Sequence, residues 1–395
     1  MIRRTAGLLA GAALLAACSS NASSQPIEAE TTAATTFGST TADITTSTLA
    51  PTTTTQARPT SAEAAVVAAF AARAQALMDS GDVHAISLAI RDDSVSVGTV
   101  ALGHDTAGQP LAPTAPFRLA SISKVLLTTT VMQLVEQGAI SLDDTLASQW
   151  TGTLHVTDAR VRDITVRQLL QHTSGIDKLR RTFFLDGGID WRQAADIALA
   201  SPLQSDPGTT YVYSNANFVI LGRLVEQVTG SPVDVAVAMQ VLRPLGIENA
   251  RMNPDTHSFA PDGPAYIVGR RREYLEALGP AGAWEMSADQ IATVLAGLQP
   301  DSSHPLVSAE SLQQMLNTVV VPEDDVFPAY GLGLMISPSF YGHTGTIEDV
   351  SAFAVDLPNG YTVVVLTASE EVGGGEGLVE RFAAELALLA ALPAR

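Results

Sequence analysis

The order of periodic patterns along the chain constrains its fold more than any other feature. From about residue 84, apolar and polar residues alternate in a way that predicts two strands joined at Asp92 and Asp93, and alternation returns after residue 330. Between these regions, apolar residues are mainly spaced by three and four positions, which predicts helices. The sequence therefore predicts a sheet built from both ends of one domain, with a largely helical segment between them.

The individual elements follow from the same patterns. Helices are predicted at residues 64–78, 120–137, 166–172, 191–200, 216–229, 233–245, 288–298 and 378–392; strands are predicted at 84–91, 94–103, 330–336, 341–345, 350–357 and 361–369.

The first 17 residues have the features of a secretory signal. Arg3 and Arg4 precede an apolar run that ends at Leu15-Ala-Ala-Cys18, a tetrapeptide that resembles the bacterial lipobox. The resemblance implies that Cys18 is lipidated and that the protein is extracytoplasmic, anchored to the cell membrane by lipid. The alternative is a chance cysteine after a plain signal peptide. Because Cys18 is the only cysteine, the chain can form no intrachain disulfide and no cysteine metal cluster.

Residues 18–61 predict a disordered linker. Thirteen of the 25 positions from Thr31 to Thr55 are threonine, and such a tract cannot bury enough apolar surface to fold. It is either an unmodified spacer or an O-glycosylated stalk. Residues 62–395 are then the catalytic domain. The net charge of −19 argues against electrostatic binding of nucleic acid or of an anionic membrane, and its simplest interpretation is solubility.

The residues with the clearest chemistry are Ser121 and Lys124. The chain has 22 basic residues, of which only Lys124 and Lys178 are lysines. Arginine is always protonated, whereas burial can make a lysine amine neutral and able to act as a base. On a helix, positions i and i+3 share a face, so the Lys124 amine can reach the Ser121 hydroxyl. The alternatives are a helix-capping serine and a solvent-exposed lysine.

Two further motifs follow in the chain, Tyr213-Ser-Asn215 and His343-Thr-Gly345. Each is weak alone, but together with Ser-x-x-Lys, and before their order is counted, they arise by chance in on the order of one chain in a thousand. The three motifs resemble those of the serine β-lactamase and penicillin-recognising superfamily, in its class C-like and DD-peptidase-like branch. The resemblance covers roughly residues 62–395 and implies an α/β (α+β) fold, a mostly antiparallel sheet flanked by helices with an inserted all-helical lobe.

The resemblance also implies the roles of the site residues. Ser121 would be the nucleophile, with Lys124 and Tyr213 as proton carriers. Asn215 would bind the substrate amide and hold Lys124. His343 would donate to a substrate carboxylate or pass a proton, and Thr344 would contact the substrate through its hydroxyl. Thr346, just after the His343-Thr-Gly345 motif, would form an oxyanion hole with Ser121 through backbone N–H groups.

Simpler interpretations remain for three of these residues: a half-buried loop aromatic for Tyr213, a turn-forming residue for Asn215 and a structural strand histidine for His343. By resemblance, His172 is a structural loop residue. No cofactor or metal is expected, because the histidines show no metal-ligand spacing.

Two segments depart from the family pattern. Relatives usually have further glycines after His343-Thr-Gly345, but here Glu348 and Asp349 follow, so two acids are expected near the pocket mouth, where they would disfavour a substrate carboxylate. The alternative is that both acids point to solvent at a strand end. Trp284 and Glu285 interrupt a loop of small residues, and Trp284 either lines the acyl pocket or anchors the core.

These observations predict a serine hydrolase that forms an acyl-enzyme at Ser121. Its substrates would be cell-wall peptides, as for a DD-peptidase (carboxypeptidase type), or small esters and amides. A β-lactamase ranks lower because His343 and the two acids weaken carboxylate recognition. A non-catalytic penicillin-binding or envelope interaction protein remains a further alternative.

Overall fold

The structure is a computed structural model that describes residues 59–105, 108–185, 188–252, 274–317, 326–369 and 372–394. The predicted signal segment 1–17, Cys18 and nearly all of the predicted linker lie outside the described residues. Within the described ranges, no helix is both long and apolar enough to cross a membrane.

A seven-stranded antiparallel sheet forms the centre of the domain, in the order β2-β1-β10-β9-β8-β7-β6. The two N-terminal strands pair directly with the C-terminal ones: Ile86 of β1 lies opposite Thr367 of β10. The predicted α/β fold with a mostly antiparallel sheet is therefore confirmed. The strands are β1 (Ala85–Asp92), β2 (Val95–Gly103), β6 (Ala329–Tyr330), β7 (Met335–Ile336), β8 (Tyr341–Ile347), β9 (Val350–Asp356) and β10 (Tyr361–Thr367).

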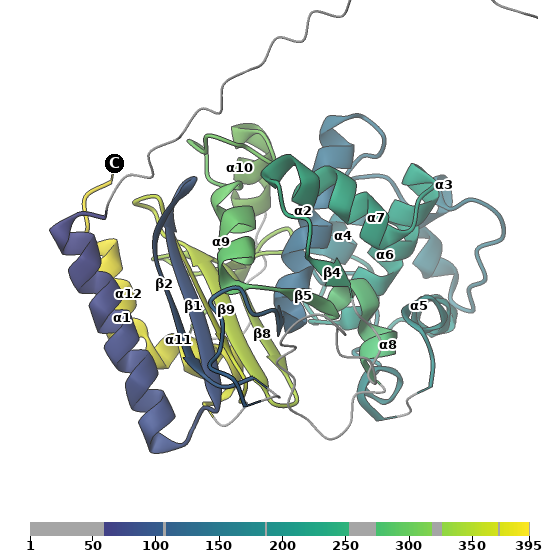
Figure 1. Ribbon diagram of the computed structural model, residues 1–395. Helices are drawn as coiled ribbons and strands as arrows, with labels where there is room; N and C mark the ends of the chain where they lie inside the picture. The colour runs from purple at the N-terminus through teal and green to yellow at the C-terminus, as the bar shows by residue number, and fades with distance from the viewer. Residues whose placement is uncertain are drawn as a thin grey trace, which may run out of the picture. The chain divides into compact units, whose positions relative to one another are not determined.

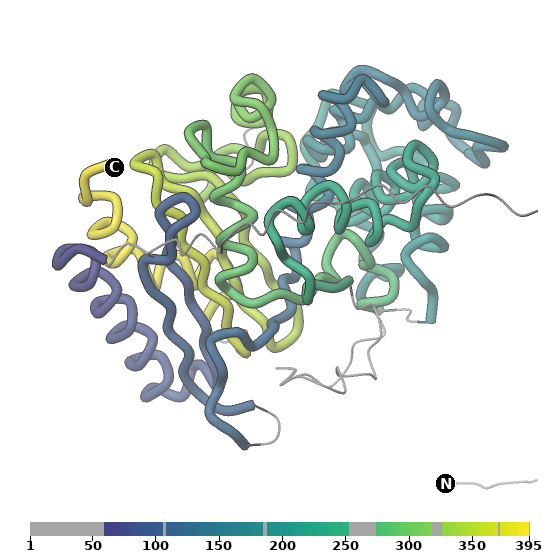
Figure 2. Tube along the Cα trace, turned by 45° about the horizontal axis from the view of Figure 1, so that its top comes forward, coloured from purple at the N-terminus to yellow at the C-terminus, as the bar shows by residue number. Residues whose placement is uncertain are grey.

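Helices cover both faces of this sheet. α1 (Ser61–Ser80) lies beside the C-terminal helices α11 (Gly374–Arg381) and α12 (Ala383–Ala390) on one face, and α9 (Ala288–Ala296) packs on the other (Figures 1 and 2). The two ends of the described domain thus lie side by side. α1 begins at a capping box in which Thr60 and Glu63 satisfy each other's backbone N–H groups.

The inserted helical region lies beyond α9, at the right of Figure 1. Its elements are the α-helices α2 (Ser123–Glu136), α3 (Leu146–Gln149), α4 (Val166–Leu170), α5 (Trp191–Ala200), α6 (Asn215–Thr229), α7 (Val233–Val237) and α8 (Tyr274–Leu278), with the single turns η1 (Ala120–Ile122), η2 (Ala159–Asp163), η3 (Arg181–Leu185), η4 (Ala238–Leu242), η5 (Arg243–Leu245) and η6 (Gly279–Ala281). A further helix, α10 (Ala309–Asn317), follows α9.

A three-stranded sheet that the sequence did not predict links this region to the main sheet. It has the order β3-β5-β4, with β3 (Phe117–Arg118), β4 (Arg251–Met252) and β5 (Trp284–Met286). Glu285 of β5 pairs with the guanidinium groups of Arg118 at 3.3 Å and Arg251 at 2.9 Å. Arg118 and Glu285 are both buried, so separating them would leave a buried charge without its partner. The ion pair therefore holds Arg118, and with it the chain just before Ser121, against β5.

Three predicted elements differ in detail from the structure. The predicted strand 330–336 is two short strands, because the chain turns at Gly333, which has a φ of 68°. The predicted helix 378–392 is divided into α11 and α12 at Phe382, which has a φ of −103°. The predicted helix 233–245 continues past α7 only as a π turn and a 3-10 turn, as Pro244 cannot donate an α-helical hydrogen bond.

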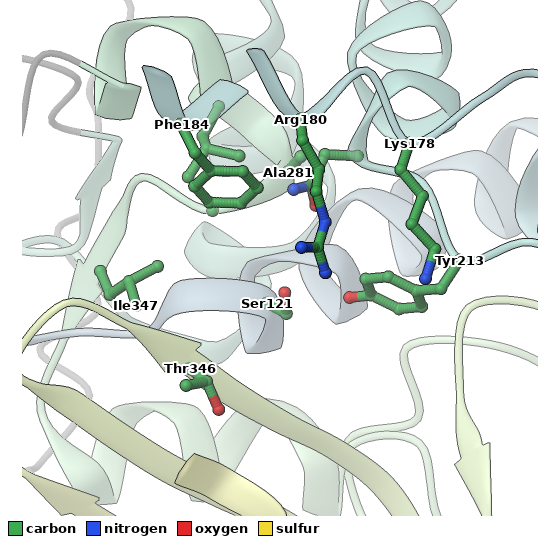
Figure 3. A pocket seen from close by; sticks show the side chains of 11 residues that line it. Ser121, Lys178, Arg180, Phe184, Tyr213, Ala281, Thr346 and Ile347 are labelled. Carbon is green, nitrogen blue, oxygen red and sulfur yellow. The ribbon is translucent and has the colours of Figure 1, made fainter. Parts of the chain in front are cut away.

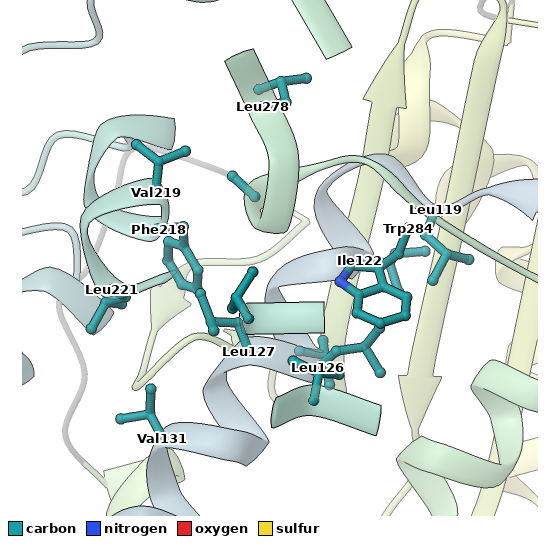
Figure 4. Close-up of a cluster of buried hydrophobic side chains, with 14 of the residues drawn as sticks. Leu119, Ile122, Leu126, Leu127, Val131, Phe218, Val219, Leu221, Leu278 and Trp284 are labelled. Atoms are coloured by element: carbon teal, nitrogen blue, oxygen red, sulfur yellow. The ribbon is translucent and has the colours of Figure 1, made fainter. Parts of the chain in front are cut away.

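A hydrophobic cluster under the site holds α2 in place. Leu126 and Leu127 of α2 pack among Phe218 of α6, Leu278 of α8 and Trp284 of β5, all of them almost fully buried (Figure 4). Burying such side chains stabilises the fold by about 1.5–3 kcal/mol each. The position of α2, and with it that of Ser121 and Lys124, therefore depends on three other elements.

Candidate active site

Ser121 lies in the 3-10 turn η1, directly before α2. The preceding residue, Ala120, has a φ of 47°, in the left-handed region that residues with a Cβ rarely adopt. Strand β8 crosses closest to this turn at Gly345, where a Cβ would lie 2.4 Å from the Leu119 carbonyl oxygen. The absence of a side chain at Gly345 thus allows β8 and the turn that carries Ser121 to make contact.

Lys124 is fully buried and its amine makes three contacts. The Nζ atom lies 3.0 Å from Ser121 Oγ, 2.9 Å from Asn215 Oδ1 and 2.9 Å from the Ala281 carbonyl oxygen. Burial lowers the pKa of Lys124 well below its usual value. A neutral amine has two N–H groups and one lone pair, which match the two carbonyl acceptors and the Ser121 O–H donor. Lys124 can therefore accept the Ser121 proton.

Tyr213 lies against both members of this pair. Lys124 Nζ is 5.1 Å from the centre of the Tyr213 ring, and the buried Tyr213 hydroxyl is directed toward Ser121 (Figure 3). Burial raises the pKa of Tyr213, and the nearby Ser121 hydroxyl offsets only part of that rise. Tyr213 is therefore a neutral phenol that can pass on a proton, and the environment favours Lys124 over Tyr213 as the base.

The His172 ring packs against the Tyr213 ring. The two ring centres are 4.3 Å apart, and His172 Nδ1 accepts hydrogen bonds from the Ser214 backbone N–H at 3.2 Å and from Asn217 Nδ2 at 3.0 Å. Asn217 Oδ1 in turn accepts from Ser174 Oγ at 2.6 Å. Burial, with a smaller effect from Lys124, lowers the pKa of His172 well below its usual value. This burial and bonding are compatible with the structural role in a loop that the resemblance implied for His172, which stays a prediction.

The structure does not bring His343 to the pocket surface. Its ring is fully buried, with Nε2 at 3.1 Å from the Tyr330 hydroxyl and Nδ1 at 2.6 Å from the Thr344 carbonyl oxygen. Burial, and to a smaller degree Lys124, lowers the pKa of His343 to about 3. His343 is therefore neutral, and its expected direct contact with a substrate carboxylate is not available in this arrangement.

Thr344 is not part of the pocket lining either, although it lies on the same face of β8 as Thr346. The Thr344 hydroxyl donates to Glu376 Oε1 at 2.5 Å, and the residue is only 2% exposed. The expected contact of this hydroxyl with the substrate is therefore wrong for this arrangement. Thr346, in contrast, is exposed and lines the pocket, while its Oγ1 accepts from the Gly375 N–H at 2.8 Å.

The edge of β8 faces the pocket. The strand pairs with β7 only at Tyr341 and Gly342 among the described residues, so the stretch from His343 onward has no strand neighbour on that side. An unpaired edge can align an extended substrate by main-chain hydrogen bonds. This arrangement is compatible with the predicted oxyanion hole of Ser121 and Thr346 N–H groups, which stays a prediction.

The pocket above Ser121 is lined by residues from five parts of the chain (Figure 3). In its described part the lining consists of Ser121, Lys178, Arg180, Phe184, Tyr213, Asn215, Leu278, Ala281, Gly282, Thr346 and Ile347.

Glu348 and Asp349 are not part of this lining, which corrects the expectation that they form the pocket mouth. The lining ends at Ile347, and the two acids form the turn between β8 and β9, where Asp349 has a φ of 59° and the Glu348 N–H donates to the Tyr274 hydroxyl at 3.1 Å. In the described part of the lining the charged groups are instead the cations Lys178 and Arg180. Glu348 and Asp349 therefore give no reason to rank a β-lactamase below a peptidase or an esterase.

Trp284 does not line the pocket either. It is 1% exposed and packs near Ile122 and Leu126, so it anchors the core, which was the second of its two interpretations (Figure 4).

Several site residues had not been predicted from the sequence. Ala281 contributes a backbone carbonyl, which no sequence motif marks. Tyr330 was placed only in a strand, with no hint of its bond to His343. Lys178 carried a usable signal, since it is the second of only two lysines and follows His172-Thr-Ser-Gly175 by three residues.

The fold and the site together define a class of protein. A serine at a strained turn, a buried lysine bonded to it and a tyrosine beside both are the arrangement expected of a serine hydrolase in which lysine replaces histidine as the base.

Comparison with known proteins agrees with this class. Residues 70–388 match the family described as Beta-lactamase, so the chain belongs to that family. It is 34% identical over 162 residues to penicillin-binding protein 4 of Amycolatopsis lactamdurans, a match that covers 38% of this chain and 40% of that relative. The matched part is thus less than half the length of that relative.

Two further proteins share more of the chain. A putative D-alanyl-D-alanine carboxypeptidase of Escherichia coli (strain K12) is 25% identical over 303 residues, covering 64% of this chain and 68% of the relative. The solved structure of a D-stereospecific amidohydrolase from Streptomyces sp. superimposes with a TM-score of 0.64 at 26% identity, covering 80% of this chain and 98% of the other.

Proposed function

We propose that this protein is a serine hydrolase that forms an acyl-enzyme at Ser121 and cleaves amide or ester bonds in cell-wall peptides or small substrates. The observation that carries the proposal is the buried Lys124 amine at 3.0 Å from Ser121 Oγ, with its two other contacts made to carbonyl oxygens. The carboxypeptidase and amidohydrolase relatives support the substrate class.

The first half of the reaction follows from this geometry. Neutral Lys124 takes the Ser121 proton as Oγ bonds to the substrate carbonyl carbon, and the oxyanion that forms is held by backbone N–H groups. Tyr213 donates its proton to the leaving group as the carbonyl–leaving group bond breaks, and is reprotonated from Lys124. Water then hydrolyses the ester at Ser121 by the reverse proton path, which restores the enzyme.

Covalent labelling tests this proposal. The full-length protein, treated with a fluorescent penicillin or a fluorophosphonate, is expected to gain the mass of the adduct, whereas Ser121→Ala is expected to gain none. Ser339→Ala, which removes an exposed serine in the turn before β8, is the matched control and should label like wild type. Labelling of Ser121→Ala at the wild-type rate would contradict the proposal.

The location of the protein is a separate proposal. The sequence pattern at residues 1–18 supports export and a lipid anchor at Cys18, which would hold the domain in the cell envelope near its substrate. The Cys18→Ala protein is expected to move from the detergent phase to the aqueous phase in a phase-partition experiment, or to remain unprocessed. A processed Cys18→Ala protein that stays in the detergent phase would exclude the anchor.

A further inference from the structure

The pocket concentrates positive charge beside the nucleophile. Lys178 and Arg180 both line it, and no carboxylate does so among the described residues. The chain as a whole carries a net charge of −19, with 41 acidic and 22 basic residues. The sign of the charge in the described lining is therefore opposite to that of the chain as a whole. This difference suggests that the two cations serve the pocket itself.

Neither cation is used to hold the fold. Both residues are exposed, and within the described part of the chain neither side chain forms an ion pair or a hydrogen bond. Other arginines of the helical region do form ion pairs: Arg160 pairs with Asp158 and Asp206, and Arg192 pairs with Glu226. The charges of Lys178 and Arg180 are thus available to a ligand.

The local backbone keeps the two side chains at the pocket. Leu179, between them, packs against the core and has a φ of 46°, a conformation that costs free energy for a residue with a side chain. Lys178 and Arg180 extend from this point toward Tyr213 and Ser121 (Figure 3). The Lys178 amine lies beside Tyr213 in that view, and the Arg180 guanidinium lies between Phe184 and Tyr213.

The opposite side of the pocket is apolar. Phe184, Leu278 and Ile347 line it, and Phe184 is 45% exposed, with its ring centre 5.5 Å from that of Tyr274. The pocket is therefore divided: one side suits an apolar group, and the side at Tyr213 suits a negative charge. A guanidinium binds a carboxylate with two parallel hydrogen bonds, and a neighbouring ammonium group adds attraction.

We infer that Lys178 and Arg180 determine specificity by binding a carboxylate on the leaving group of the substrate. The inference rests on the proposed function, because it takes the Tyr213 side of the pocket as the side where the leaving group is protonated. In this account the segment after His172-Thr-Ser-Gly175 performs the carboxylate recognition that was expected of His343, whose ring is buried.

Two pairs of model esters test the inference. In the first pair the charge is on the leaving group: 3-acetoxybenzoate is compared with its methyl ester. In the second pair it is on the acyl group: mono(4-nitrophenyl) adipate is compared with its methyl ester. For each pair the measured quantity is the ratio of kcat/KM for the anionic ester to that for the neutral ester, at low and at high salt.

The combined variant Lys178→Gln with Arg180→Gln is expected to lower this ratio about tenfold for the leaving-group pair at low salt, and by clearly less for the acyl pair. In the wild type the ratio should fall as salt is raised, because exposed charges are screened. The matched control is Arg162→Gln with Arg243→Gln, which removes two exposed charges from outside the pocket and should leave both ratios unchanged.

Two results would overturn the inference: a leaving-group ratio within about twofold of wild type, or an equal loss in both pairs, which would indicate a general field rather than a subsite. Its failure is distinguishable from that of the proposed function. If wild type hydrolyses the neutral esters only with Ser121 intact but the ratios do not respond, the inference alone fails. If wild type neither hydrolyses them nor forms an adduct, the proposed function fails, and the inference with it.

Discussion

At Lys124, burial and hydrogen bonding both favour the neutral amine that can accept the Ser121 proton. Burial disfavours the charged amine, and the two carbonyl contacts leave the lone pair for the Ser121 hydroxyl. An arginine at this position would remain charged and could not accept a proton. The presence of a lysine here, in a chain whose basic residues are otherwise almost all arginine, thus has a chemical reason.

The pH dependence of acylation follows from the lowered pKa of Lys124. Only the neutral amine accepts the Ser121 proton, so the acylation rate should rise with pH through that pKa and reach its plateau well below pH 10.5, the usual value for lysine. Stopped-flow acylation rates from acid to alkaline pH measure this. A rate that is still rising tenfold per unit near pH 10 would show that Lys124 is charged at neutral pH.

Substitution of Lys124 tests the same role. Lys124→Arg keeps a positive charge but should lower kcat/KM by about 10²-fold or more, because the base is lost. The control is the opposite exchange, Arg91→Lys, at a residue that is not in the pocket lining and that pairs with Asp289 at 2.7 Å. That variant should keep activity. Near-normal turnover by Lys124→Arg would remove Lys124 as the base.

The sequence predicted the contacts between residues that are close along a helix. It did not predict contacts that depend on where the chain turns or on segments far apart in sequence. The Ser121–Lys124 contact follows from helical spacing, so the motif was sufficient. Glu348 was placed wrongly because proximity in sequence does not determine where a chain turns, and the left-handed Asp349 directs both acids into the turn. Ala281 lies 157 residues from Lys124 and contributes only backbone, so no pattern could reveal it.

Among the elements, β8 positions the site through one close approach. A Cβ at residue 345 would lie 2.4 Å from the Leu119 carbonyl oxygen and 3.1 Å from Ala120 Cβ, so β8 and η1 would have to separate. Since Thr346 follows on the same strand, its N–H would move relative to Ser121. The glycine of His343-Thr-Gly345 is thus required for packing as well as for access.

Gly345→Ala should therefore reduce acylation by about tenfold to 10²-fold and lower stability by about 1–3 kcal/mol. Acylation rates and urea unfolding measure the two effects. Gly138→Ala is the control: it adds a Cβ in a left-handed position with no atom within 4 Å, so it should cost stability without slowing acylation. Normal acylation by Gly345→Ala would mean that the close approach does not position the site.

The elements that the sequence predicted best are those with strong periodicity. The central hairpin, α2, α6 and the last two long strands were all predicted close to their observed bounds, because their apolar faces match a single period. The sheet of β3, β4 and β5 was missed, since its strands have two or three residues and are defined by partners more than 30 residues away.

At the scale of the whole domain, the sheet contains an acid that links stability to pH. Asp356, at the end of β9, is fully buried; it accepts hydrogen bonds from Gln299 at 3.1 Å and from the Thr362 hydroxyl. Burial raises the pKa of Asp356 from 3.8 to about 7, as the hydrogen bonds only partly offset it. The folded protein therefore keeps a proton on Asp356 that the unfolded chain has lost.

The sign of the effect follows from this difference. Stability from the bound proton is fully present below about pH 4 and is lost as pH rises to about 7, at up to about 1.4 kcal/mol per pH unit. Asp356→Asn should not show this loss. The free energy of unfolding of Asp356→Asn minus that of wild type should therefore rise between pH 4 and 7 and stay constant above pH 7. Asp301→Asn, at an exposed position, is the control. Parallel pH profiles of Asp356→Asn and wild type would contradict the assignment.

The most direct test of the account is to locate the acyl group during turnover. Wild-type protein is mixed with methyl 3-acetoxybenzoate, quenched in acid within the first turnover, digested and analysed by tandem mass spectrometry. The account predicts an acetyl group, a mass increase of about 42 Da, on Ser121 of the wild-type protein. At the same time point it predicts none on Ser121 of the Lys124→Arg protein. An acetyl group on another residue, or equal acetylation of Ser121 in both proteins, would contradict it.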